Sequence, residues 1–425
     1  MLEEVQLFNS KRDILLAFFI LSFIAIYSTL IEYNNYKQLT HFDSNIVSAT
    51  LLKKYDKTKI SKKGKLKKYQ ILKLKSTKGY TFFTSARKSQ RFLIGQKLKL
   101  EIWAGRISFY QYLKGFYAYS RVIYKYKNLS LKQKLNSLIA NEHQNKTIAS
   151  VYQALFTAAQ LDSKIQSQFS SLGISHLVAI SGFHLGVLSA LLFFIFKYPY
   201  KFFQQRYFPY RSYKVDSFIF ISIILLIYLI FLDYPPSLLR AFVMLVIGFF
   251  LYDRGIKVFS YLTLLLAVIL LLALFPRLLF SIGFWLSVSG VFYIFLFIIH
   301  YKNLSKFWQF ILIPFWVYLL MLPYSIVIFA NFSLYHPLSI IWSSLFTIFY
   351  PLSIFLHLIN HGNLLDGVVQ YLLNLDTGNS RVILDWKYLI FYVSISLGAI
   401  YKKALLYLSL LFALCVFIYS IYEIA

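Results

Sequence analysis

Cysteine and acidic residues are scarce in this chain of 425 residues. The one cysteine, Cys415, excludes a disulfide within the chain and a cysteine-based metal site. The chain has 16 Asp and Glu against 44 Lys and Arg, so few carboxylates are present for acid–base catalysis. It also lacks the GxxxxGK(S/T) loop that binds ATP. We therefore predict a protein that is not an enzyme and holds neither metal nor cofactor.

Apolar sequence is abundant. Hydrophobic residues make up 59% of the chain and aromatic residues 20%, more than a soluble protein of this length could bury. Apolar runs of roughly 20 residues, enough for a helix to cross a bilayer, recur along the chain, and we count about nine or ten. The run at 13–31 lacks a small-residue cleavage site and is predicted to be an uncleaved anchor. The composition thus predicts a polytopic α-helical membrane protein.

The later spans can be placed from the same pattern. The predicted spans are 174–196, 217–232, 237–252, 258–275, 278–300, 307–330, 336–358, 388–400 and 404–422. The eighth of these is short and could be re-entrant. The predicted organisation is an anchor at 1–31, a β domain at 32–107, interfacial helices at 108–172, a membrane core at 173–360 and a C-terminal part at 361–425.

Between the first two spans the sequence changes character. Alternating apolar and polar residues predict strands at 45–55, 65–77, 80–86 and 97–107. Residues 32–114 contain 20 Lys and Arg against 4 Asp and Glu. A small, basic, OB-type β-barrel fits this pattern, because such barrels often bind single-stranded nucleic acid. The alternative is a generic β domain with a solvated basic surface.

Basic and aromatic residues of this domain are candidates for capturing a nucleic-acid strand. The candidates are Lys62, Lys63, Lys65, Lys67, Lys68, Lys73, Lys75, Tyr80, Phe82, Phe83 and Trp103. The aromatic residues could equally be core. In 108–172 we expect amphipathic helices at the membrane interface, with aromatic anchors at Tyr110, Tyr112, Phe116, Tyr117, Tyr119 and Tyr124.

The distribution of basic residues predicts the orientation. The loop 197–214 contains five Lys and Arg, so it is predicted to be cytoplasmic. Alternation of the spans then gives a cytoplasmic N-terminus and an external β domain. Lys402 and Lys403 do not fit this alternation.

With this orientation, polar residues of four segments fall near the external side. They are His176, Ser181, His184, Asp233, Arg240, Ser281, Ser287, Asn331 and His336. Ionisable groups at membrane depth usually face a bundle interior or a wet cavity, so these residues predict a lined mouth. For either His176 or His184 the alternative is a satisfied core histidine. For Arg240, near a helix N-terminus that favours anions, the alternative is an ion pair with Asp233.

The formal net charge of +28 favours an anionic partner, such as nucleic acid, anionic lipid or an acidic polysaccharide. The alternative is an AT-rich genome that favours lysine codons.

Residues 173–184, which read GISHLVAISGFH, resemble the GxSHLLAISGLH signature of the ComEC/Rec2 family of competence proteins. Three shorter stretches resemble other family motifs: PSLLRA at 236–241, GFWLS at 283–287 and HPLS at 336–339. Trp285 and Ser339 depart from the usual Gln and Ala. The resemblance covers about 154–351, and more loosely the β domain.

The resemblance implies an inner-membrane channel that imports single-stranded DNA during natural transformation. The HxHxDH metal-ligand cluster of the nuclease-like domain in larger members is missing. The implied partners are the lipid bilayer, single-stranded DNA, cytosolic DNA-translocating or single-strand-binding proteins, and a separate periplasmic DNA receptor and nuclease. A homo-oligomer of the chain is one further option. Two alternatives are a membrane enzyme acting on lipid-linked or polysaccharide substrates and a scaffold that binds anionic lipid.

Overall fold

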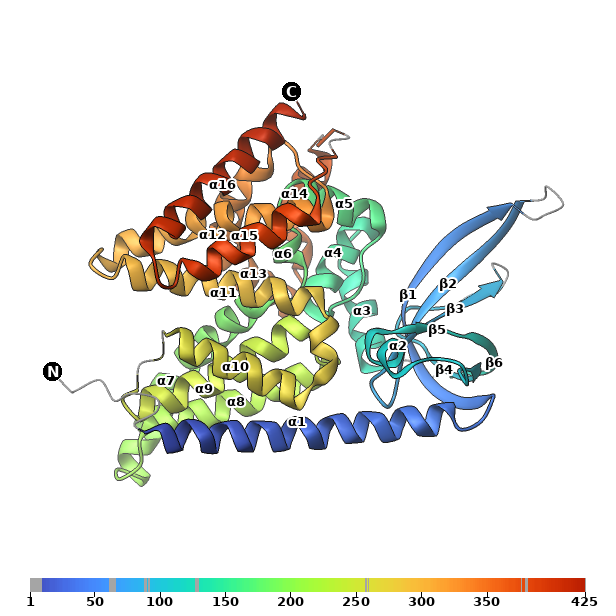
Figure 1. The fold of residues 1–425 in the computed structure, drawn as a ribbon, viewed down its shortest axis with the longest axis horizontal. Coiled ribbons are helices and arrows are strands. Elements are labelled where there is room, and N and C mark those ends of the chain that lie inside the picture. Colours follow the sequence, from blue (N-terminus) through green and yellow to red (C-terminus); the bar gives the residue numbers. More distant parts are fainter. Residues whose placement is uncertain are drawn as a thin grey trace. The chain divides into compact units, whose positions relative to one another are not determined.

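The computed structural model describes residues 10–60, 66–87, 90, 92–126, 130–256, 258, 260–375, 377–378 and 381–424. Figure 1 shows a mostly helical chain with one β-sheet. The chain divides into two compact units. The sheet unit contains residues 10–138 and 269–281, and the helical unit contains residues 139–268 and 282–425. Each unit is described by itself.

The sheet unit begins with α1 (Lys11–Thr40), a helix of 30 residues. Ser10 caps its first turn: the Ser10 hydroxyl accepts from the Asp13 amide, and the Asp13 carboxylate accepts from the Ser10 amide. At 1.5 Å per residue, this helix is about 45 Å long, whereas the hydrocarbon core of a bilayer is about 30 Å thick. It is therefore long enough to cross a membrane and extend beyond it.

Six strands form one sheet. They are β1 (Asn45–Ile60), β2 (Leu66–Ser76), β3 (Thr81–Arg87), β4 (Lys97–Trp103), β5 (Phe116–Tyr117) and β6 (Tyr119–Lys125). Their order is β5-β3-β2-β1-β4-β6, and only the β3–β5 pair of this sheet is parallel. The sheet is open and mixed, so the predicted closed OB-type barrel is not confirmed. It does curl, because the hydroxyls of Thr84 on β3 and Ser120 on β6 lie 2.8 Å apart.

Alternation along the strands gives the sheet two different faces. One face forms the core of the unit, with Leu51, Leu72, Leu74, Leu98 and Leu100 fully buried. On β2 and β4 these leucines alternate with Lys73, Lys75, Lys97 and Lys99, which point to the opposite face, as period-two alternation requires. The predicted strand positions are therefore confirmed, and the lysine-rich alternation that predicted them divides core from surface.

Residues 116–125 differ from the sequence prediction. We expected interfacial helices there, but the helix α2 (Phe109–Lys114) ends at Gly115 and the chain then forms β5 and β6. Gly115 has φ 108°, a conformation that favours glycine and turns the chain back toward the sheet. Tyr117, Tyr119 and Tyr124 are exposed on these strands. The predicted helices after this point are present as α3 (Leu131–Asn141), α4 (Lys146–Thr157) and α5 (Ser163–Ser171).

Arg277 links α1, α2 and the sheet within this unit. It lies in the short helix η1 (Pro276–Phe280) and forms an ion pair with Glu32 of α1. The same guanidinium donates to the Tyr112 hydroxyl at 2.9 Å and lies over the Tyr112 ring. Burial raises the pKa of Tyr112. Glu32 follows the apolar part of α1. Its ion pair with Arg277 therefore holds η1 against the C-terminal part of α1.

The helical unit is built from long apolar helices. The remaining elements are α6 (Ser175–Val178), α7 (Gly182–Tyr207), α8 (Tyr213–Phe231), α9 (Pro236–Asp253), α10 (Tyr261–Leu274), α11 (Ile282–His300), α12 (Lys306–Phe329), η2 (His336–Leu338), α13 (Ser339–Leu358), η3 (Gly362–Leu365), α14 (Asp366–Asn374), α15 (Trp386–Gly398) and α16 (Lys403–Tyr422). Within the described residues, eight helical segments have the length and composition to cross a membrane: α1, α7, α8, α9, α11, α12, η2 with α13, and α16. The chain is therefore a polytopic helical membrane protein.

Three predicted spans differ from the observed helices. The span predicted at 258–275 is α10, which has only 14 residues. The span predicted at 174–196 is broken, because α6 ends at Val178 and α7 begins only at Gly182. The short span predicted at 388–400 is α15, which has 13 residues. It packs beside α12 and α16 (Figure 1). Tyr293 of α11 donates to Ser396 at 2.9 Å, so a hydrogen bond between side chains fastens this short helix to the bundle.

Candidate functional site

The break between α6 and α7 is shaped by the residues of the GISHLVAISGFH segment. Ser181 is the N-cap of α7, and its hydroxyl accepts from the Phe183 amide at 3.3 Å. His184 completes a capping box, with its Nδ1 3.2 Å from the Ser181 amide nitrogen and 3.1 Å from the Ser181 hydroxyl. Ser181 and His184 are therefore held together by local sequence, because a cap residue and the third helical residue naturally face each other.

Gly173, at the start of the same segment, packs against His336. Gly173 has φ +71°, and a Cβ atom at this position would lie 2.9 Å from Cε1 of His336. The His336 ring is 4% exposed, and its Nδ1 lies 3.1 Å from the Tyr318 hydroxyl. Glycine is thus required here both by backbone conformation and by the imidazole ring that occupies the space of a side chain.

His176 connects the two histidines. Its Nε2 lies 3.1 Å from the Ser343 hydroxyl of α13, and it is within electrostatic interaction range of both His184 and His336. The Nε2 atom of His336 is buried and has no hydrogen bond to any described residue, whereas the His184 ring has the Leu177 backbone as a partner. Buried polar atoms normally have a protein or water partner, so His336 marks a place that can accept a polar group.

Arg240 joins three helices near their N-terminal ends. Its Nε donates to the Ser287 hydroxyl of α11 at 2.9 Å, and its Nη1 lies 3.0 Å from Sδ of Met244. A Cβ atom on Gly182 would lie 3.2 Å from Arg240 Nη2, so the guanidinium also reaches the start of α7. Arg240 is 5% exposed. The Ser237 hydroxyl donates to the Ile180 carbonyl at 2.8 Å, which fixes α9 against the same segment.

The structure therefore brings together segments that are distant in the chain. The starts of α7, α9 and α11 meet at Gly182, Arg240 and Ser287, and the segment before α13 meets Gly173 through His336. Asp233 is exposed in the turn before α9, with φ 64°. Sequence reasoning identified the polar residues but not Gly173, Gly182 and Tyr318, whose roles depend on close packing that no local pattern reveals.

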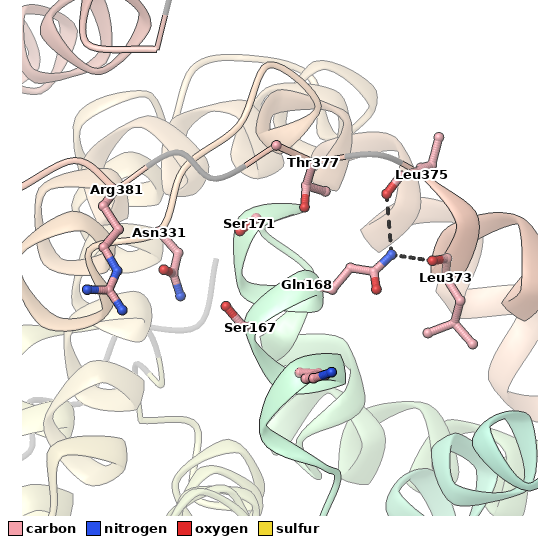
Figure 2. Close-up of a pocket in the computed structure, with 10 residues that line it drawn as sticks. Ser167, Gln168, Ser171, Asn331, Leu373, Leu375, Thr377 and Arg381 are labelled. Atoms are coloured by element: carbon pink, nitrogen blue, oxygen red, sulfur yellow. Dashed lines mark hydrogen bonds between the residues drawn. The ribbon is translucent and has the colours of Figure 1, made fainter.

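A polar cavity of about 460 Å³ lies beside this region (Figure 2). It is formed between α5, the segment before η2 and the segment after α14. Its lining is Lys164, Ser167, Gln168, Ser171, Asn331, Leu373, Leu375, Thr377, Gly378 and Arg381. It adjoins the motif because Ser171, two residues before Gly173, accepts a hydrogen bond from Ser333 at 2.8 Å.

A second, much smaller cavity lies along α9. Its volume is about 30 Å³, and it is lined by Met244, Ile247, Gly248, Leu251, Val258, Thr263, Ala267 and Phe295. Met244 also contacts Arg240, so the cavity continues along α9 from the arginine. A space of this size holds about one water molecule.

The sheet unit presents a separate basic and aromatic surface, which we call the outer face. Strand register places Lys53 opposite Lys73, Lys75 opposite Thr50, and Lys99 opposite Tyr124, all on the side away from the core. Burial, followed by the charge of Lys73, lowers the pKa of Lys53, and burial lowers the pKa of Lys73. Lys73 Nζ lies 5.6 Å from the centre of the Phe83 ring. Like charges held together in this way favour an anionic ligand.

The predicted capture residues divide into three groups. Tyr80 and Phe82 are 2% and 0% exposed, so they belong to the core of the sheet unit. They cannot stack on a base in this conformation. Trp103 is 44% exposed, Lys68 is exposed, and Lys73, Lys75 and Phe83 are half-buried on the outer face. Lys62, Lys63 and Lys65 lie outside the described residues, and so does the side chain of Lys67. The exposed rings of Tyr117, Tyr119 and Tyr124, predicted as membrane anchors, extend this face.

Metal chemistry finds no support in the part of the chain that the structure describes. No group of three or more His, Cys, Asp and Glu side chains there could hold a metal ion. The arrangement is instead suited to hydrogen bonding and to electrostatic attraction of an anion.

The fold and the buried polar contacts define a multi-pass helical membrane protein with a basic sheet unit. Residues 157–421 match the family model described as competence protein. Because the match covers more than half of the chain, the protein belongs to the Competence protein family, and the resemblance drawn from the motifs is confirmed. Comparison with curated proteins and with solved structures found no match. Membership indicates a role in DNA uptake for competence, as a transport component rather than an enzyme.

Proposed function

We propose that this chain forms the path by which single-stranded DNA crosses the bacterial inner membrane in natural transformation. One observation carries the proposal: in a competence-family protein, the starts of α7, α9 and α11 meet around the buried guanidinium of Arg240. A charge at the centre of a bilayer costs at least about 2.5 to 3.5 kcal/mol, so a phosphate polymer needs a polar passage. The histidines, Ser181, Ser287 and Arg240 supply polar groups for that passage.

The outer face of the sheet unit captures the strand first. Its lysines attract phosphates without reading sequence, and its exposed aromatic rings can stack on bases at about 1 to 3 kcal/mol per base. Trp103, Tyr119 and Tyr124 are available for this, since each is more than 40% exposed. This surface is the part of the chain that binds the DNA. A separate periplasmic receptor would bring the DNA to it.

The contacts of the last helices support one orientation. The His300 ring lies 3.1 Å from the Ala399 carbonyl, so the turn before α16 meets the end of α11. Lys302, Lys306, Lys402 and Lys403 therefore gather at one end of the bundle. At the other end, Asn331 pairs with Arg381 in a β-bridge. The segment 331–381 thus starts and ends on one side.

We assign the end with these four lysines to the cytoplasm, because short cytoplasmic loops are enriched in Lys and Arg. The sheet unit, η1 and Arg381 are then external. Lys402 and Lys403 did not fit the alternation of spans predicted from the sequence. They fit it if the chain enters the membrane at α13 and returns to the outer side through α14, so that these two helices add no net crossing. The inner membrane is the bilayer that such a protein must cross.

Passage of a strand beside Arg240 requires movement, because the cavity next to it along α9 holds only about 30 Å³. We place the opening between α9 and α11, where the Arg240–Ser287 hydrogen bond can exchange for a phosphate. Cytosolic DNA-translocating or single-strand-binding proteins would pull the strand, and a separate nuclease would supply it. Several copies of the chain could assemble around the path.

The test is uptake of labelled DNA into the cytoplasm by a deletion strain that carries Arg240→Ala. We expect uptake to fall strongly while DNA still binds at the cell surface. Arg254→Ala, at the other end of α9 and exposed, is the matched control and should transport normally. Normal uptake by Arg240→Ala at normal protein level would exclude the proposed path. Loss of lipid-linked polysaccharide with DNA uptake intact would favour a membrane enzyme, and a preference of the purified protein for anionic vesicles over single-stranded DNA would favour a lipid scaffold.

A further inference from the structure

The polar cavity of the helical unit has the composition of an anion site. Its volume of about 460 Å³ is within the roughly 300–1,000 Å³ of small-molecule pockets. Two cations, Lys164 and Arg381, and no carboxylate are found among its described lining residues. Ser167, Ser171, Asn331 and Thr377 add hydroxyl and amide groups that can donate hydrogen bonds. Arginine and lysine with several neutral donors are the groups that recognise phosphate.

The cavity walls are held in place by specific contacts. Gln168 Nε2 donates to the carbonyls of Leu372, Leu373 and Leu375 and so fastens α5 to the end of α14. The Val382 amide donates to the Ala330 carbonyl at 3.3 Å, next to the Asn331–Arg381 bridge. Figure 2 shows Arg381 beside Asn331 on one side of the cavity and Ser167 on α5 opposite them. The two cations come from segments more than 200 residues apart, and both are exposed, so they can reach a ligand from solvent.

The position of the cavity relates it to the motif. Ser171 lines it and accepts from Ser333, and Gly173, two residues later, packs on His336. The same segment then leads to Gly182, which packs against Arg240. One stretch of chain, 171–182, therefore connects the cavity to the buried arginine.

We propose that this cavity binds one phosphodiester group of the incoming single strand, through Lys164 and Arg381, before the strand reaches Arg240. This inference rests on the proposed function and adds a defined binding site outside the buried region. The ligand is the sugar-phosphate backbone, so the site is indifferent to base sequence. Two phosphate-directed cations give it the salt dependence of a counterion-release site.

The test uses the full-length protein in nanodiscs and a fluorescent oligothymidylate. Each phosphate contact to a single strand contributes about 0.7 to the slope of log K against log salt. The double variant Lys164→Gln, Arg381→Gln removes the contact to one phosphate and should therefore reduce the magnitude of that slope by about 0.7. The double variant Arg254→Gln, Lys302→Gln removes the same charge from exposed positions away from the cavity and should keep the wild-type slope. Arg381→Lys, with its charge retained, should keep most of the slope and shows that folding is intact.

Crosslinking locates the strand independently. In a Cys415→Ser background, Thr377→Cys should crosslink to an oligothymidylate that carries thiol-reactive maleimide groups, and Lys302→Cys should not. A wild-type slope in the cavity double variant, or equal crosslinking at both positions, would overturn the inference while leaving the proposed function standing. No oligonucleotide binding by the wild-type protein would overturn the proposed function itself. If phosphatidylglycerol nanodiscs abolish a difference that phosphatidylcholine nanodiscs show, a lipid headgroup occupies the cavity and the inference is wrong.

Discussion

The Nδ1 atom of His143 lies 2.8 Å from the Asp366 carboxylate, although 223 residues separate them. The other ring nitrogen of His143 lies 3.1 Å from Nε2 of His357, and the ring stacks on Tyr152 at 4.6 Å. These contacts tie the turn before α4 to both ends of the connection between α13 and α14. The excursion of the chain after α13, and with it the position of Arg381, therefore depends on a buried histidine.

Asp366→Asn should destabilise the helical unit. A hydrogen bond to a charged group contributes about 1.5 to 3 kcal/mol, and the neutral amide loses the charge that strengthens it. We expect a lower temperature of thermal aggregation for the detergent-purified protein. The control is Asp253→Asn, at the exposed last residue of α9. Equal stability of Asp366→Asn and wild type would show that the His143–Asp366 contact does not stabilise the helical unit.

Gly173→Ala should abolish DNA uptake at near-normal protein level. Alanine would have to adopt a left-handed backbone conformation, which costs about 1 to 2 kcal/mol. Its Cβ would lie 2.9 Å from Cε1 of His336, so the ring would have to move. Gly186→Ala is the matched control, because nothing lies within 4 Å of its added Cβ. Transformation frequency and an immunoblot measure the two effects. Normal transformation by Gly173→Ala would mean that the position of His336 does not matter for transport.

Lys53→Met should stabilise the sheet unit and weaken its binding of single-stranded DNA. Like charges directly opposite each other in a sheet destabilise it by roughly 0.2 to 1 kcal/mol. The lowered pKa of Lys53 means that the folded protein disfavours the ammonium form. This penalty is present at neutral pH and is relieved as the pH rises through that lowered pKa.

The stabilisation by Lys53→Met should therefore shrink as the pH is raised. Thermal unfolding between neutral pH and about pH 10, near the ordinary lysine pKa, measures it. Lys54→Met, one residue away and exposed, should show no such trend. A gain in stability that is the same at every pH would contradict a cost of burying the Lys53 ammonium group beside Lys73.

Cysteine labelling tests the proposed orientation. In a Cys415→Ser background, Lys402→Cys should react with a membrane-impermeant maleimide only after the cytoplasmic side is opened. Ile383→Cys, which is 75% exposed in the wild-type structure, should react in intact spheroplasts, as should Lys99→Cys on the sheet. Reaction of Lys402→Cys and Lys99→Cys from the same side would contradict the arrangement of α15 and α16.

Much of the fold could be predicted from local sequence. Apolar runs long enough for a bilayer predicted the long helices, because partition into lipid depends on composition averaged over about 20 residues. Alternation at 65–77 and 97–107 predicted β2 and β4 because it reports directly which residues face the core. The motif at 173–184 predicted the competence family, which residues 157–421 then confirmed.

The errors fall where pairing is not local. Residues 116–125 read as an aromatic interfacial segment, but β5 pairs with β3 and β6 with β4, and neither partner is adjacent in sequence. Tyr80 and Phe82 resemble exposed stacking rings in sequence and are buried in the core. Whether an aromatic ring on a strand faces core or solvent depends on which face the rest of the chain covers.

The sequence by itself determined that the chain crosses a membrane, carries an excess of positive charge and belongs with the competence proteins. Only the tertiary structure decided that Gly182 meets Arg240, that Gly173 meets His336 and that Lys164 and Arg381 share one cavity. Hydrophobicity and periodicity are properties of short stretches. Contacts between segments far apart in the chain depend on how whole helices pack, and that packing positions the polar groups on which transport would depend.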